Sequence, residues 1–178
     1  YPLFLSSNDL QIGRGEPVED TARVLSRFLD AIMIRTFAQS EVEALAEYGS
    51  IPIINGLTDY CHPCQVLADL MTIREYKGSY KDRKLCCVGS GSSVNSIIVG
   101  AVKMQMDVVV ACPENNLPDK DIMKWASENG SFECTTDIMA AAKDADVIYI
   151  EAWPKNEKKG YTVDKNVTDA AKSDAIVL

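Results

Sequence analysis

The stretch Ile53-Ile-Asn-Gly-Leu-Thr-Asp-Tyr-Cys-His-Pro-Cys-Gln65 decides the fold, because within it the pattern of a buried strand changes into that of a helix. The apolar run over residues 51–54 predicts the strand. A polar loop with one glycine follows, and Pro63 then stands where a helix begins, since proline lacks an N–H and has a fixed φ. Beyond it, side chains recur at helical spacing at Leu67, Leu70, Met71 and Arg74.

His62, Cys64 and Gln65 therefore lie where the loop after a strand meets a helix N-terminus, which attracts anions and is the ligand edge of an open α/β sheet. Three interpretations are open at this level. His62 could be a structural residue that caps the helix. Cys61-His-Pro-Cys64 could be a redox motif, because a helix start depresses a thiol pKa. His62 and Gln65 could instead bind an anion and polarise a carbonyl group.

The composition is that of an ordinary globular protein. The chain has 178 residues, of which 47% are hydrophobic and 25% are charged, enough for one core or two small ones. The net charge of −8 argues against nucleic acid as a partner, and no apolar run is long enough to span a membrane.

The cysteines and the single histidine restrict the chemistry further. Six cysteines are too scattered for a disulfide scaffold, so we expect a reducing compartment, with core positions for Cys86, Cys87, Cys112 and Cys134. One C-x-x-C and one histidine supply no second ligand pair for zinc. We therefore expect neither a metal nor another cofactor.

Predicted strands and helices alternate along the chain, which is typical of parallel sheets covered by helices. We expect strands over residues 3–5, 31–34, 51–54, 85–88, 108–111, 132–134 and 147–150 and at the C-terminus. We expect helices from Pro17 to near Asp30, from Ser40 as N-cap to Gly49, after Pro63, around residues 97–104, over 119–129, and after Asp137 as N-cap. The fold class is α/β, with two domains that each contain a parallel sheet flanked by helices. The charged segment 77–83, which contains Gly78, predicts the boundary between a domain over residues 1–78 and one over 82–178.

Two further features mark the predicted ligand edge. Arg35 follows the apolar strand over residues 31–34, where a charge is typical of that edge. The turn Gly89-Ser-Gly-Ser-Ser-Val94 is a partial dinucleotide fingerprint without its third glycine. We favour a tight turn that presents Ser92 and Ser93 at a helix N-terminus.

Two separated blocks of sequence resemble the ornithine carbamoyltransferases of the aspartate/ornithine carbamoyltransferase family. The first is Asn8-Asp-Leu-Gln-Ile-Gly-Arg-Gly-Glu-Pro-Val-Glu-Asp-Thr-Ala-Arg-Val-Leu-Ser-Arg-Phe28. The second comprises residues 54–65 with its His-Pro-Cys-Gln segment and residues 67–75. The spacing between the blocks fits as well, and a weaker resemblance continues to residue 178. Cys61 departs from the family pattern, which makes the C-x-x-C incidental.

The resemblance implies transfer of a carbamoyl group from carbamoyl phosphate to the δ-amine of L-ornithine, giving L-citrulline and phosphate. Arg35 and His62 would be catalytic, polarising the carbamoyl carbonyl. Gln65 would hold the carbamoyl amide together with the backbone of His62, Pro63 and Cys64. Gln11 would reach the carbamoyl phosphate of a neighbouring subunit, because the family forms trimers. The resemblance also implies arginine metabolism in the cytoplasm or in an organellar matrix.

The amine half of the site departs from the family. Its Gly-Asp-Gly-Asn-Asn turn is here Gly89-Ser-Gly-Ser-Ser93, and its Asp-x-Trp-x-Ser-Met-Gly loop is here Glu151-Ala-Trp-Pro-Lys-Asn-Glu157. We assign ornithine binding to Ser93, Glu151, Lys155 and Asn156, with Glu151 meeting the α-amino group. The changes also allow a carbamoyltransferase with a different amine acceptor or a catalytically silent paralogue, and a thiol oxidoreductase using Cys61 and Cys64 is a further alternative.

The family's Ser-Thr-Arg-Thr-Arg phosphate-binding motif and its His-Cys-Leu-Pro motif would lie outside residues 1–178. We therefore expect the chain to be the central part of a longer enzyme, and to be inactive by itself because half of the phosphate site is missing.

Overall fold

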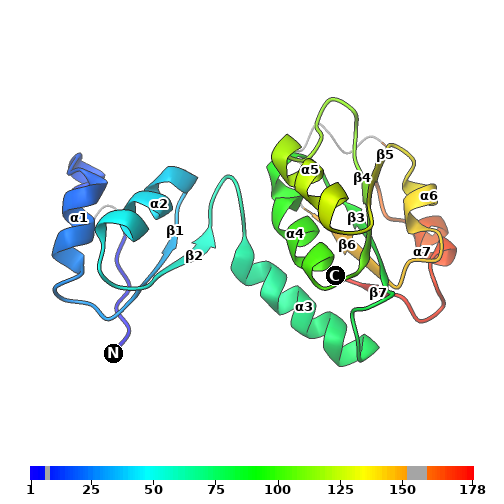
Figure 1. Ribbon diagram of the computed structural model, residues 1–178, viewed down its shortest axis with the longest axis horizontal. Helices are drawn as coiled ribbons and strands as arrows, with labels where there is room; N and C mark the ends of the chain where they lie inside the picture. The colour runs from blue at the N-terminus through cyan, green and yellow to red at the C-terminus, as the bar shows by residue number, and fades with distance from the viewer. Residues whose placement is uncertain (7–8, 152–159) are drawn as a thin grey trace. The chain divides into compact units, whose positions relative to one another are not determined.

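The computed structural model describes residues 1–6, 9–151 and 160–178, and its contacts divide the chain into two compact units, Tyr1–Asp59 and Tyr60–Leu178 (Figure 1). The first unit contains η1 (Gln11–Arg14), α1 (Val18–Leu25), β1 (Ile32–Arg35), α2 (Gln39–Tyr48) and β2 (Ile53–Leu57). The second contains α3 (Pro63–Lys77), β3 (Lys84–Val88), η2 (Gly91–Val94), α4 (Asn95–Lys103), β4 (Asp107–Ala111), α5 (Lys120–Asn129), β5 (Phe132–Thr135), α6 (Ile138–Ala142), β6 (Val147–Ile150), α7 (Lys165–Ala170) and β7 (Ile176–Val177).

The first unit is built on a parallel pair of strands, β1 and β2, in which Ile32 pairs with Ile53 and Met33 with Ile54. Helices α1 and α2 pack against each other, and Ala22, Val42 and Leu45 are its buried apolar residues. Met33 and Ile54 remain 68% and 47% exposed. One face of this short sheet is therefore largely exposed among the described residues.

The second unit contains a five-stranded parallel sheet in the order β5-β4-β3-β6-β7. The chain runs outward from β3 through β4 to β5, crosses to the other side of β3, and continues through β6 to β7. The strand order therefore reverses between β3 and β6. In open α/β sheets, ligands bind beyond the carboxyl ends of the strands at this kind of reversal.

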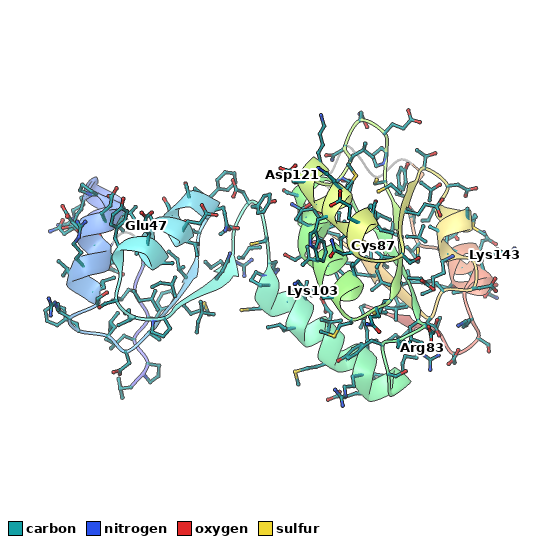
Figure 2. All side chains as sticks on the ribbon, in the orientation of Figure 1. Glu47, Arg83, Cys87, Lys103, Asp121 and Lys143 are labelled. Atoms are coloured by element: carbon teal, nitrogen blue, oxygen red, sulfur yellow. The ribbon has the colours of Figure 1, made fainter. Side chains whose placement is uncertain are left out.

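Two cores cover the two faces of this sheet, with α3, α4 and α5 on one face and α6 and α7 on the other (Figure 1). Successive side chains of β3 alternate between them, so that Leu85 and Cys87 enter the first core and Cys86 and Val88 the second. All four are fully buried, and Cys87 is labelled in the interior of the unit in Figure 2. Such continuous apolar runs are expected in strands that are buried on both faces.

Helix α3 lies close to α4 because Gly100 has no side chain. A Cβ at that position would overlap Cγ1 of Val66 in α3 and touch Leu70. The buried face of α3 consists of Val66, Asp69, Leu70 and Ile73. Leu67 and Met71, which we expected at helical spacing with Leu70, are 62% and 64% exposed.

Asp146 ties the amino ends of three strands together. Its carboxylate is fully buried and accepts hydrogen bonds from Arg83 Nη1 at 2.9 Å, from the backbone N–H of Lys84 at 2.9 Å and from Lys172 Nζ at 2.8 Å. Burial by itself would raise the pKa of Asp146, but these donors outweigh it and hold the pKa below its usual value. Figure 2 labels Arg83 just before β3.

The predicted α/β class with parallel sheets is confirmed, and Asp137 caps α6 as expected, accepting from the N–H groups of Met139 and Ala140. Asp119 and Asp164 cap α5 and α7 in the same way. The predicted domain boundary near residues 78–82 stays a prediction, whereas the contacts of α3 assign that helix to the second unit.

Three local predictions are wrong. Residues 3–5 form no strand with any described part of the chain, and Phe4 is 94% exposed. Helix α1 ends at Leu25 rather than near Asp30. The next residue, Ser26, donates its hydroxyl hydrogen to the carbonyl of Ala22 and so competes with the backbone hydrogen bonds of the helix. Ser40 lies within α2, because the helix begins at Gln39 with Ala38 as N-cap, two residues before the predicted cap, and Asp59 Oδ1 accepts from the N–H of Gln39.

Candidate active site

Arg35 lies at the carboxyl end of β1, at a break in the pairing with β2. Ile34 pairs with Asn55 and Arg35 with Leu57, so Gly56 is the extra residue of a bulge. A Cβ on Gly56 would lie 3.0 Å from the carbonyl oxygen of Ile34 and 2.8 Å from the Met33 sulfur. The glycine therefore permits the bulge, and Arg35 is exposed where β1 ends.

A polar network joins the loops that follow β1 and β2. Gln39 Oε1 accepts from Thr58 Oγ1 at 2.7 Å and from Asn55 Nδ2 at 3.2 Å, and the backbone N–H of Asp59 donates to the carbonyl of Phe37 at 2.7 Å. These bonds fix the segment that leads from β2 towards His62. Gln11, the other predicted residue of this unit, begins η1 and is exposed.

His62 is the N-cap residue of α3, but its imidazole makes no capping hydrogen bond. The segment is held by its backbone instead. The N–H of His62 donates to Ser96 Oγ at 2.8 Å, and the carbonyl of Tyr60 accepts from the buried Asn95 at 3.2 Å. His62 therefore occupies the cap position of α3 as that interpretation expects, but its half-buried imidazole contributes no capping hydrogen bond.

Gln65 and Asp69 form a pair one turn apart on α3. Gln65 Nε2 donates to Asp69 Oδ1 at 2.9 Å. Asp69 is only 6% exposed, whereas Gln65, Cys64 and Pro63 are exposed. Burial is the main cause that raises the pKa of Asp69, with Glu151 acting in the same direction, while the bond from Gln65 and the nearby His62 lower it.

Glu151 follows β6 directly, at the point where the strand order reverses. Its N–H donates to the carbonyl of Val88, and a Cβ on Gly89 would lie 2.8 Å from the Glu151 Cβ. Tyr149 donates its hydroxyl hydrogen to Glu151 Oε2 at 3.1 Å. Burial, followed by the charges of Glu151 and Asp69, raises the pKa of Tyr149. Glu151 and Asp69 thus interact electrostatically.

The Gly89–Ser93 turn lies beside Glu151 as a consequence of that close approach. Ser93 is exposed, but its hydroxyl donates to the carbonyl of Ser90 at 2.7 Å. Ser90 Oγ accepts a hydrogen bond from Asn116 Nδ2. The backbone carbonyl of Asn116 in turn accepts from the N–H of Gly91. Lys155 and Asn156 fall outside the described residues.

The second unit therefore brings four predicted residues to one edge: His62, Gln65, Ser93 and Glu151. Two further predicted residues, Arg35 and Gln11, belong to the first unit. Sequence reasoning missed Asp69 and Tyr149, which connect the two sides of this edge. The helical spacing of Gln65 and Asp69 was a signal that could have identified the first of them.

The cysteines at this edge form no disulfide bond. Cys61 is half-buried, Cys64 is exposed, and all six cysteines are thiols rather than disulfides. In the part of the chain that the structure describes, no three histidine, cysteine or acidic side chains gather as metal ligands would. Among the described helices, none has the length and apolar character needed to cross a membrane.

Comparison with known proteins supplies family likenesses for both parts of the chain. Residues 1–75 match the carbamoyl-P binding domain of aspartate/ornithine carbamoyltransferase, and residues 81–178 match its Asp/Orn binding domain. The ornithine carbamoyltransferase of Methanosphaera stadtmanae is 46% identical over 194 residues, covering 99% of this chain and 64% of that protein. That of Pyrococcus horikoshii is 47% identical over 195 residues, covering 100% of this chain and 62% of that protein.

A solved structure agrees with these sequence likenesses. The ornithine carbamoyltransferase from Pyrococcus furiosus matches with a TM-score of 0.92 and 43% identity, over 98% of this chain and 61% of that one. The chain thus spans about three fifths of the length of the relatives that it matches.

Proposed function

Because the chain belongs to the aspartate/ornithine carbamoyltransferase family, we propose that the whole protein transfers a carbamoyl group from carbamoyl phosphate to the δ-amine of L-ornithine. The products are L-citrulline and phosphate. The observation that carries this proposal within the chain is the shared sheet edge of the second unit, where His62 and Gln65 begin α3 and Glu151 follows β6. The names of the relatives support ornithine as the acceptor.

The proposed reaction needs hydrogen-bond donors where negative charge develops. The nitrogen lone pair of ornithine attacks the carbamoyl carbon, and a tetrahedral oxyanion forms. Arg35 and the His62 imidazole stabilise that oxygen. The oxyanion then reforms the C=O double bond while the bond between the carbamoyl carbon and the bridging oxygen breaks. Its electron pair leaves with the phosphate, and the phosphate takes up the proton that the amine loses. The dianionic leaving group requires cationic partners.

The substrates divide between the two groups of residues. Gln65, with the backbone of Pro63 and Cys64, receives the carbamoyl amide, and Gln11 contacts the carbamoyl phosphate of a neighbouring subunit. Glu151 meets the α-amino group of ornithine, with Ser93, Lys155 and Asn156 around the amino acid. Because Gln11 serves a neighbouring subunit, we infer a homotrimer. We also infer a cytoplasmic enzyme of arginine metabolism. Sedimentation analysis tests the trimer, and a monomer in solution would contradict it.

The test of the function is citrulline formation by the whole protein from carbamoyl phosphate and ornithine, with phosphate release followed in parallel. Equal amounts of citrulline and phosphate are expected. Cys61→Ser is the matched control, because it changes a thiol next to His62 that the proposal does not use, and it should retain activity. Product with another amine but not with ornithine would overturn the acceptor. No product with any amine would overturn the transferase.

A further inference from the structure

Among the described residues of the second unit, Asp69 and Asp146 are the buried carboxylates, and their surroundings differ. Asp146 has hydrogen bonds to both oxygens, from three donors. Asp69 is 94% buried, since its exposed fraction is 6%, and only Oδ1 is paired, with Gln65. Oδ2 is buried and has no hydrogen bond within the described ranges 1–6, 9–151 and 160–178. A buried acceptor without a partner opposes folding, so this oxygen requires an explanation.

The groups around Asp69 compensate its charge only in part. Glu151, which follows β6, repels a negative Asp69, and the hydroxyl of Tyr149 is directed to Glu151 rather than to Asp69. The His62 ring at the start of α3 acts in the opposite direction. A residue of this kind reduces stability, and such residues are typical of places where chemistry rather than packing determines the side chain.

The bond between Asp69 and Gln65 has a chemical consequence. An ionised carboxylate can only accept hydrogen bonds, so the NH₂ group of Gln65 must face Asp69. The other end of the carboxamide, the carbonyl oxygen Oε1, is then directed away as an acceptor on an exposed side chain. A carbamoyl NH₂ group is a donor and matches this oxygen. Without Asp69, the carboxamide could rotate and present either end.

We propose that Asp69 is a positioning residue, which holds the Gln65 carboxamide in the one orientation that presents Oε1 to the carbamoyl amide. This inference rests on the proposed function, because it takes carbamoyl phosphate as the ligand of Gln65. Asp69 does not touch the substrate and acts through Gln65. The unpaired Oδ2 of Asp69 lowers the stability of the fold, while Oδ1 orients the acceptor Oε1 of Gln65.

The experiment compares Asp69→Leu and Asp69→Asn with the unmodified protein, and Asp146→Leu is the matched control for a buried carboxylate. Asp69→Leu should leave Tm unchanged or raise it, because it removes an unpaired buried oxygen, while Asp146→Leu should lower Tm by about 10 °C or more. The Kd for carbamoyl phosphate should rise about tenfold in Asp69→Leu, the cost of one oriented hydrogen bond. Asp69→Asn should lie between, because its amide can accept from Gln65 or donate to it.

A measurement without ligand separates this inference from the proposed function. The side-chain NH₂ signals of Gln65 in ¹H–¹⁵N spectra, assigned by their loss in Gln65→Ala, should move towards the values of a solvated amide in Asp69→Leu. Unchanged signals, an unchanged Kd, or a fall in Tm as large as that of Asp146→Leu would each overturn the positioning role. Signals that move while the unmodified protein binds no carbamoyl phosphate would support the orientation of Gln65 and overturn the proposed function.

Discussion

His62 begins α3 without using its side chain for the helix. The backbone N–H of His62 and the carbonyl of Tyr60 hold the segment through Ser96 and Asn95, and the imidazole makes no cap. The fold therefore does not depend on the ring, whereas the proposed oxyanion does. This separation makes His62 a residue at which stability and activity can be tested independently.

We expect His62→Ala to lower kcat/KM about 10²- to 10³-fold, the usual loss when one donor to a developing oxyanion is removed. Its Tm should stay within a few degrees of that of the unmodified protein. Steady-state kinetics and thermal unfolding measure the two effects. Ser96→Ala is the reverse control, because it removes the acceptor of the His62 N–H and should lower Tm. A His62→Ala enzyme with unchanged kcat/KM would exclude the ring from the reaction.

Asp146 gives a pH dependence of known sign. Its pKa is lower in the folded protein than its usual 3.8, so the unfolded chain binds more protons around that pH. The stabilisation by its ionised form is therefore complete above the unfolded pKa of about 3.9. It is lost as the pH falls through the lower folded pKa.

We expect Asp146→Asn to reduce the free energy of unfolding by about 3 kcal/mol at pH 7, because charged Arg83 and Lys172 lose their shared partner. Urea unfolding at pH 7, 5, 4 and 3 measures the difference from the unmodified protein. The difference should be constant above pH 5 and should shrink below pH 4. A difference that grows as the pH falls would contradict the lowered pKa.

At the scale of elements, the crossing of α3 and α4 depends on Gly100. An added Cβ would overlap Val66, so Gly100→Ala should destabilise the second unit by about 1–3 kcal/mol, although alanine favours a helix over glycine by about 1 kcal/mol. The double variant Val66→Ala with Gly100→Ala should recover part of that loss, because the new methyl group fills the space that valine leaves. Additive effects of the two changes in urea unfolding would argue against the contact.

The elements themselves could be predicted largely from local patterns. Strands β3, β4 and β6 and the Asp137 cap follow from apolar runs and from a side chain that satisfies free N–H groups. The predictions failed where a distant residue decides the outcome. The N-terminus of α2 depends on Asp59, twenty residues away, and residues 3–5 have no partner strand among the described residues.

In the candidate site, too, local patterns predicted some residues, and residues placed by distant contacts were missed. His62, Gln65 and Arg35 lie at ends of elements, which a sequence pattern reveals, and the resemblance assigned them roles. Asp69 lies in a stretch where Leu67 and Met71 have equal claim to the buried face, and packing against α4 decided for Val66, Asp69 and Ile73. The approach of Tyr149 to the same edge depends on the sheet order, which the sequence did not specify.

At the scale of the whole molecule, the two units should differ in protection from solvent. The first unit rests on two strands with an exposed apolar face, and isolated two-stranded sheets are marginal, whereas β3 is paired on both sides and buried on both faces. We expect amide hydrogens of β3, β4 and β6 to exchange at least about 100-fold more slowly than those of β1 and β2. Hydrogen exchange followed by mass spectrometry measures this, and equal rates would show that the units open together.

The neighbouring thiols of β3 have a practical consequence. Cys86 and Cys87 face opposite cores, both are fully buried, and burial raises the pKa of Cys86 to about 11. An alkylating reagent would modify the exposed Cys64 within the native protein, but it would reach the two β3 sulfurs only when the central strand leaves the sheet. The rate at which the mass of the alkylated chain increases would thus measure the rate of global opening, without any added probe.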